Sequence, residues 1–95
     1  MDILFHVGTE AGARFLLPLA LASRRAGHVF GAFFTHDGVR GLLDTDLQAA
    51  LHETRSVACK ESWLRFCGDV ACPVKLGSQT LNSALMSETR RVVSL

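Results

Sequence analysis

The sequence of 95 residues predicts an α/β protein, a three-layer α/β/α sandwich around a mostly parallel sheet of about five strands. Two observations predict this fold. Short apolar runs alternate with helical segments along the whole chain, and the loops between them are short. The chain has no internal repeat, low-complexity segment or linker, so we expect a single domain over residues 1–95.

The chain begins with a predicted strand and a predicted helix. Residues 2–8 form a short apolar run that ends in glycine, which is typical of a buried strand. Residues 9–13 read as a loop and helix start with Thr9 as a possible N-cap, and residues 14–26 predict a helix that ends at a glycine. Pro18 favours a helix start nearer Arg14 than Glu10, because proline is best tolerated in the first turn.

The predicted first helix is apolar around most of its circumference. A helix that rests on a sheet and faces water needs only one apolar stripe. We therefore expect a second buried face, under another element or in a contact between subunits. The apolar side chains are Phe15, Leu16, Leu17, Leu19, Ala20, Leu21 and Ala22.

The remaining elements continue the alternation. Residues 28–35 are almost continuously apolar, as a central parallel strand should be. Further strands are expected over residues 55–59, 73–76 and 90–95. Helices are expected over residues 44–54, over residues 60–66 and from a Ser78 cap to about Glu88, and residues 36–41 read as a loop.

Composition excludes several classes of protein. With 48% hydrophobic residues and a net charge of +1, the chain is neither disordered nor a basic nucleic-acid binder. Its apolar stretch over residues 15–22 is too short to span a bilayer. Three cysteines, an odd number, argue against a disulfide framework. We expect a cytoplasmic protein with no direct nucleic-acid partner and no membrane partner.

Cys59 is the main candidate for chemistry. It ends the predicted strand at residues 55–59 and precedes a helix, where unpaired backbone N–H groups favour thiolate over thiol. His36 and Asp37 follow an earlier strand. Because the carboxyl ends of parallel strands share one edge, we expect all three residues to border one cleft.

Several segments, in this order, resemble the DsrE/TusD family of sulfur-relay proteins, which have the DsrE/DsrF-like fold. The resemblance covers nearly the whole chain. Its most specific parts are the aromatic strand that ends in His36-Asp37-Gly38-Val39 and the cysteine about twenty residues later. The segments are Ala26-Gly27-His28-Val29-Phe30, Phe33-Phe34-Thr35-His36-Asp37-Gly38-Val39, Cys59, Gly77-Ser78-Gln79 and Arg91-Val92-Val93-Ser94-Leu95.

The resemblance implies that Cys59 accepts sulfane sulfur as a persulfide, as a sulfurtransferase-type carrier does. Its partners would be a sulfur donor and a small sulfur-carrier protein. The resemblance also implies oligomers, either homotrimers or homohexamers or mixed assemblies of related subunits. The chain is shorter than is usual in the family, and residues 60–67 lack the small residues and paired arginines of its relay members.

Other residues near Cys59 have two interpretations each. His36 could polarise a bound group, whereas Asp37 also fits an ordinary turn before glycine. Lys60 could favour the thiolate or simply lie on a solvated helix face. Trp63, four residues after Cys59, could shield a persulfide or pack in the core.

We expect no metal and no cofactor. Cys67 and Cys72 have the spacing Cys-x4-Cys without a second pair, so a zinc site is not predicted. The turn at residues 8–12 lacks the spacing of a nucleotide-binding loop. Cys67 could instead resolve an oxidised Cys59, which would make the protein a thiol redox sensor. A further alternative is a non-catalytic assembly or binding subunit of the same fold.

Overall fold

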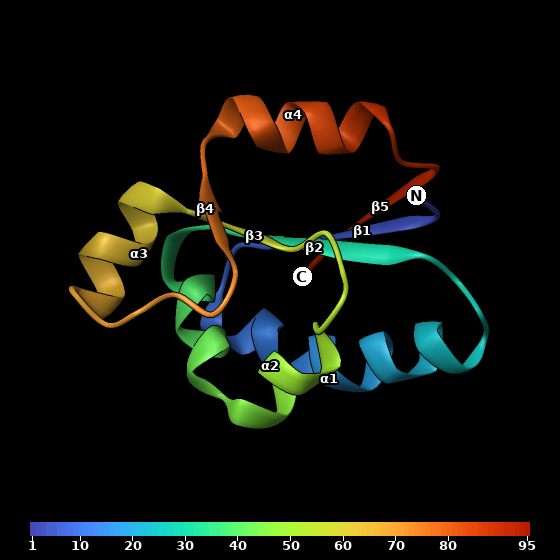
Figure 1. The fold of residues 1–95 in the computed structure, drawn as a ribbon, viewed down its shortest axis with the longest axis horizontal. Helices are drawn as coiled ribbons and strands as arrows, with labels where there is room; N and C mark the ends of the chain where they lie inside the picture. Colours follow the sequence, from blue (N-terminus) through green and yellow to red (C-terminus); the bar gives the residue numbers. More distant parts are fainter.

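The computed structural model describes all residues, 1–95, and has one five-stranded sheet (Figure 1). All neighbouring strands pair in parallel, in the order β4-β3-β2-β1-β5. The predicted α/β fold with a parallel sheet is therefore confirmed. The strands are β1 (Ile3–Val7), β2 (Phe30–Phe34), β3 (Val57–Cys59), β4 (Lys75–Gly77) and β5 (Arg91–Ser94).

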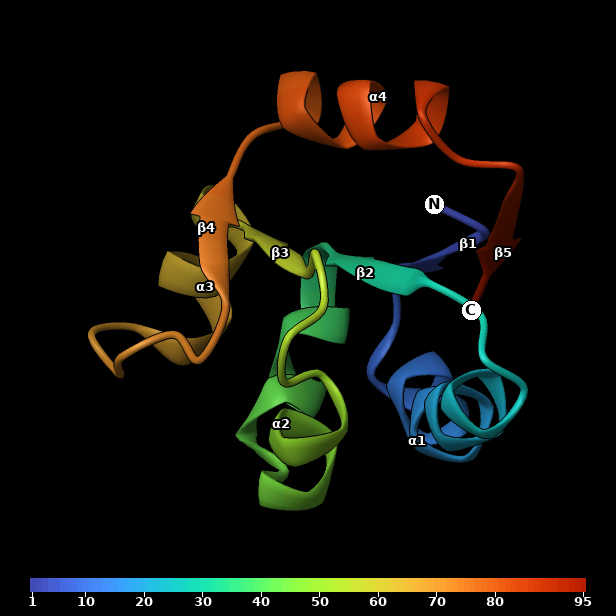
Figure 2. The ribbon, with the colours of Figure 1, turned by 45° about the vertical axis from the view of Figure 1, so that its right-hand side comes forward.

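The helices cover the two faces of the sheet unequally. They are α1 (Glu10–Arg25), the 3₁₀ helix η1 (His36–Leu43), α2 (Thr45–Ala50), α3 (Lys60–Cys67) and α4 (Gln79–Ser87). In Figures 1 and 2, α4 lies alone on one face, and α1 and α2 lie on the other. Right-handed crossovers account for this, because β1 to β4 advance in one direction and only the connection to β5 returns.

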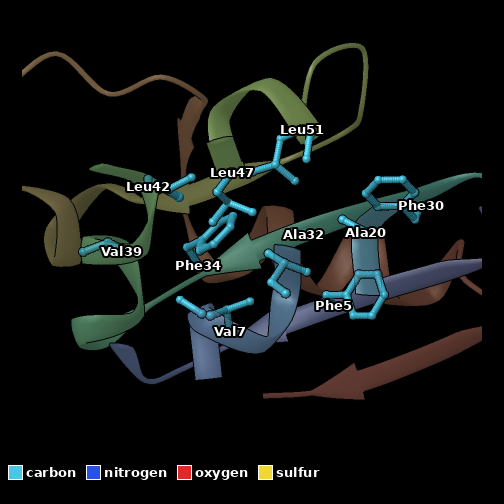
Figure 3. Packing of buried hydrophobic residues seen from close by; sticks show 14 of the residues in the cluster. Phe5, Val7, Ala20, Phe30, Ala32, Phe34, Val39, Leu42, Leu47 and Leu51 are labelled. Atoms are coloured by element: carbon cyan, nitrogen blue, oxygen red, sulfur yellow. The ribbon is translucent and has the colours of Figure 1, made fainter. Parts of the chain in front are cut away.

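The two faces also differ in the size of their cores. A cluster of 15 buried residues fills the side that carries α1, η1, α2 and α3, and Figure 3 shows Phe5, Phe30 and Phe34 within it. Only four buried residues, one of them Leu85 of α4, form the cluster between α4 and the sheet. Strand side chains alternate between the faces, so Phe33 and Val57 join the smaller cluster while Phe34 and Ala58 join the larger.

The predicted start of the first helix is wrong. Helix α1 begins at Glu10, where the Thr9 hydroxyl accepts a hydrogen bond of 2.8 Å from the Gly12 N–H. Pro18 lies inside the helix and is exposed, so water can satisfy the carbonyl that loses its N–H partner. A strong cap at Thr9 therefore outweighs the cost of an internal proline.

The loop expected over residues 36–41 is instead part of η1, which extends to Leu43. The other strands and helices lie where they are predicted, with ends that differ by a few residues. The second buried face expected for α1 is not covered within the chain, since 64% of Phe15 and 39% of Leu19 are exposed.

No helix in the structure combines the length and the apolar character that crossing a bilayer requires.

Candidate functional site

Cys59 lies at the carboxyl edge of the sheet, as the last residue of β3 and the N-cap of α3. Its half-buried side chain is on the face that α4 covers. It borders a cleft of about 610 Å³ with Lys60 and Glu61 of α3 and with residues 77–80, which lead into α4. The first turns of two helices therefore flank the thiol.

Gly77 allows this close arrangement. A Cβ atom at Gly77 would lie 2.8 Å from Cγ1 of Val57 and 2.7 Å from Cδ2 of Leu81. Both distances are too short for carbon atoms, so a larger residue would require the side chains of Val57 and Leu81 to move. The glycine brings the start of α4 close to the strand that carries Cys59.

The surroundings of Cys59 favour its thiolate. Burial acts to raise its pKa, but hydrogen bonds to the sulfur outweigh burial, so the pKa lies below the ordinary value for cysteine. The donors are the Ser62 hydroxyl, the backbone N–H groups of Ser62 and Glu61, and the Thr35 hydroxyl. The two N–H groups belong to the unpaired donors of the first turn of α3.

Two hydroxyl groups link Cys59 to His36. The Ser62 Oγ accepts a hydrogen bond of 2.8 Å from the His36 backbone N–H. The Thr35 Oγ1 lies 3.2 Å from Nδ1 of His36 and 3.5 Å from the Ser62 Oγ. His36 has a positive φ of 52°, an uncommon backbone conformation for a residue other than glycine. In this conformation its N–H reaches the Ser62 Oγ and its ring reaches the Thr35 hydroxyl.

The structure brings some of the predicted site residues together and separates others. Lys60 borders the cleft beside Cys59. His36 does not line the cleft, and it reaches Cys59 only through Thr35 and Ser62. Asp37 lies in the first turn of η1 and is half-buried, also outside the cleft lining.

Trp63 is placed in the core and not over the cleft. Its side chain is 1% exposed, belongs to the larger cluster, and donates a hydrogen bond of 2.8 Å from Nε1 to the Val70 carbonyl. Cys59 precedes the helix and faces α4, so the four-residue spacing does not put the two side chains on one face. Of the two interpretations of Trp63, the structure favours core packing.

Thr35 and Ser62 are the site residues that sequence reasoning missed. Thr35 follows Phe34, which pairs with Ala58, so Thr35 and Cys59 come next to each other at the ends of two paired strands. Ser62 is the third residue of α3, a position from which a side chain reaches back to the N-cap. The serine three residues after the cysteine was the available signal.

The other two cysteines have a different environment. Burial raises the pKa of both Cys67 and Cys72, and both pack partly against the larger cluster. Cys67 ends α3, so the rise of about 1.5 Å per helical residue puts it roughly 12 Å from Cys59. A disulfide needs Cα atoms within about 7 Å, so Cys59 and Cys67 cannot form one without unwinding the helix. No group of three or more His, Cys, Asp or Glu side chains is arranged to hold a metal ion.

No protein-family model matches the chain, and no curated protein matches it.

Ser62→Ala should raise the pKa of Cys59, because it removes the side-chain hydrogen bond that most favours the thiolate. The rate of alkylation of Cys59 by iodoacetamide, measured from pH 5 to 10 by mass spectrometry of its peptide, should shift to more alkaline pH. Ser83→Ala, on the exposed side of α4, is the matched control and should leave the profile unchanged. An unchanged profile for Ser62→Ala would show that the remaining donors, the backbone N–H groups and the Thr35 hydroxyl, stabilise the thiolate without the Ser62 hydroxyl.

Proposed function

We propose that this protein is a persulfide carrier of the DsrE/TusD type, which accepts sulfane sulfur on Cys59 and passes it to a carrier protein. The observation that carries the proposal is the half-buried thiol of Cys59, which borders a cleft between two helix N-termini and whose pKa is lowered by four hydrogen-bond donors. A thiolate is the form of cysteine that attacks sulfur.

The transfer takes two balanced steps. The Cys59 thiolate attacks the outer sulfur of a donor persulfide, R–S–SH, a new S–S bond forms, and the donor leaves as the thiolate R–S⁻. A thiolate of the acceptor then attacks the outer sulfur of Cys59–S–SH, and Cys59 leaves as a thiolate. A lowered pKa serves the second step as well as the first, because a more acidic thiol leaves faster.

The residues around the cleft suit a guest sulfur atom. The N–H groups of the first turn of α3 can donate to a terminal persulfide sulfur as they do to the thiolate. Lys60 and Glu61 are the only charged residues that line the cleft, and residues 77–80 provide uncharged polar groups opposite them. The cleft is open to solvent, as exchange with two protein partners requires. Both partners, and an oligomer of related subunits, are part of the proposal.

Loading and discharge of the wild-type protein test the proposal. After incubation with glutathione persulfide, intact-protein mass spectrometry should show the added mass of one sulfur atom, on the peptide that contains Cys59. Excess reduced glutathione should then remove that sulfur. A protein that takes up no sulfur, although its Cys59 is alkylated readily by iodoacetamide, would contradict the proposal.

The exposed apolar face of α1 favours a second candidate, a non-catalytic assembly or binding subunit. Phe15 and Leu19 lie one helical turn apart and are both exposed. Phe15→Ser should reduce self-association in sedimentation velocity if this face joins subunits, and should change the free energy of unfolding of a monomer by no more than about 0.5 kcal/mol. A Cys59 that resists alkylation in the folded protein would favour this role over sulfur transfer.

A redox sensor that uses Cys59 and Cys67 has less support. The helix between them holds the two thiols too far apart for a disulfide.

A further inference from the structure

The cleft at Cys59 is much larger than the sulfur atom that it is proposed to receive. Its volume of about 610 Å³ lies within the roughly 300–1,000 Å³ that is typical of sites for small molecules. A single sulfur atom fills only a small part of that space. The remaining space can hold the molecule that carries the sulfur.

The lining of the cleft is polar, unlike that of most small-molecule sites. Apart from Cys59, no hydrophobic side chain contributes to it. One wall carries one positive and one negative side chain, Lys60 and Glu61, and both are exposed. The other wall carries two hydroxyl groups and an amide, from residues 78–80. The cleft therefore suits a ligand that has charges of both signs and several groups that form hydrogen bonds.

The amide of Gln79 is held in place by Asn82, which lies one turn further along α4. Nδ2 of Asn82 donates a hydrogen bond of 3.2 Å to Oε1 of Gln79. Asn82 is only 5% exposed, and its own Oδ1 is buried without a hydrogen-bond partner. Such an unpaired atom lowers stability, so stability does not explain an asparagine at this position. Because Oε1 of Gln79 is occupied, its Nε2 is left to donate to an oxygen atom in the cleft.

We propose that the cleft binds the sulfur donor as a low-molecular-weight peptide persulfide, a molecule of the size and charge of glutathione persulfide. Its ammonium group pairs with Glu61 and a carboxylate pairs with Lys60, while Nε2 of Gln79 donates to a peptide oxygen. The outer sulfur then forms a bond to the Cys59 thiolate, and the S–S bond of the donor breaks. The peptide leaves as its thiolate with the electron pair of that bond, so atoms and charge balance.

The lining disfavours two other classes of small donor. Coenzyme A persulfide carries several phosphate charges, whereas the cleft offers one lysine beside one glutamate and so no net positive charge to bind them. An apolar persulfide would displace water from the hydroxyl and amide groups of residues 78–80 without replacing its hydrogen bonds. A peptide thiol avoids both costs.

The inference rests on the proposed function, whose donor it names, but its test uses a probe without sulfane sulfur. S-methylglutathione has the charges and the peptide bonds of glutathione and no reactive thiol. Bound in the cleft, it should slow alkylation of Cys59 by iodoacetamide roughly tenfold at about ten times its Kd. Mass spectrometry of the Cys59 peptide measures the rate. S-methyl-coenzyme A at the same concentration should not slow the reaction.

Variants of the lining test the assigned contacts. Lys60→Gln, Glu61→Gln and Gln79→Ala should each raise the half-protecting concentration of S-methylglutathione roughly threefold, as expected for the loss of one exposed ion pair or hydrogen bond. Lys75→Gln changes an exposed lysine outside the cleft and is the matched control. Asn82→Ala should weaken protection as Gln79→Ala does. Its midpoint of urea unfolding should stay close to that of the wild type, because removal of the unpaired oxygen offsets the lost packing.

Acetylation of the probe identifies the partner of its ammonium group. N-acetyl-S-methylglutathione has no cation, so it should protect the wild type roughly threefold less well than S-methylglutathione. In Glu61→Gln the two probes should protect equally, because the ion pair is already lost. An equal loss of protection on acetylation in both proteins would contradict the assigned pairing with Glu61.

Two further results would overturn the inference. One is the absence of protection by S-methylglutathione from a protein that glutathione persulfide still loads with sulfur, in which case the proposed function would stand with a protein as its donor. The other is equal protection by S-methyl-coenzyme A. Protection by S-methylglutathione together with failure of sulfur loading would instead contradict the proposed function and leave the ligand class of the cleft intact.

Discussion

Cys59→Ser should abolish uptake of sulfur from glutathione persulfide while leaving the protein folded. A serine hydroxyl remains protonated at neutral pH and does not attack a persulfide, so no other group at the cleft can replace the thiolate. The side chain is half-buried and serine is nearly isosteric, so we expect the free energy of unfolding to change by no more than about 1 kcal/mol. Intact-protein mass spectrometry after incubation with the donor measures the uptake.

Cys67→Ser and Cys72→Ser are the matched controls for this variant. Burial raises the pKa of both thiols, so little of either is a thiolate at neutral pH. Both control proteins should take up one sulfur atom, as the wild type does. Equal uptake by Cys59→Ser and the wild type would rule out Cys59 as the carrier of sulfur.

Trp63→Ala should have the largest effect on stability. It removes a side chain that is 1% exposed from the larger core and leaves the Val70 carbonyl without its donor. Replacing a buried aromatic residue by alanine costs about 3–5 kcal/mol, a large part of the roughly 5–15 kcal/mol that stabilises a typical domain. Urea denaturation followed by circular dichroism measures the loss, since Trp63 is the only tryptophan.

Two further variants show what a loss of stability in Trp63→Ala means. Leu64→Ala changes the neighbouring residue, whose side chain is 54% exposed, and should alter the free energy of unfolding by no more than about 0.5 kcal/mol. Trp63→Phe keeps most of the buried volume and should leave the alkylation rate of Cys59 unchanged, because the indole does not line the cleft. A faster alkylation of Cys59 in Trp63→Phe would restore the interpretation of Trp63 as a shield for the sulfur.

The order of the elements and the position of Cys59 could be predicted from the sequence for the same physical reason. Strand-like apolar runs alternate with segments of helical spacing, a pattern that permits few arrangements other than a parallel sheet. In such a sheet, a residue between a strand and the following helix lies at the edge where the strands have their carboxyl ends. The start of α1 could not be predicted as safely, because Pro18 and the Thr9 cap favour different positions. Where the helix starts depends on whether water can hydrogen-bond to the carbonyl that loses its N–H partner to the proline.

The partners of Cys59 depend on register, which the sequence does not contain. Thr35 becomes its neighbour only because Phe34 pairs with Ala58, and a shift of one residue would turn Thr35 to the other face. Helical spacing was also misleading for Trp63, since it applies within a helix and Cys59 stands before one. His36 was predicted beside the cleft, and the structure inserts two hydroxyl groups between it and the sulfur.

The unequal covering of the sheet has a consequence for motion at the cleft. Helix α4 and the strands beneath it share a cluster of four buried residues, whereas the opposite layer shares fifteen, so local opening of α4 costs less free energy than opening of the opposite layer. The hydrogen-bond donors to Cys59 come from α3 and from Thr35, the residue after β2, and not from α4. The wall of the cleft that α4 forms can therefore move to admit partners of different shapes. The donors that lower the pKa of the Cys59 thiol stay in place during this motion.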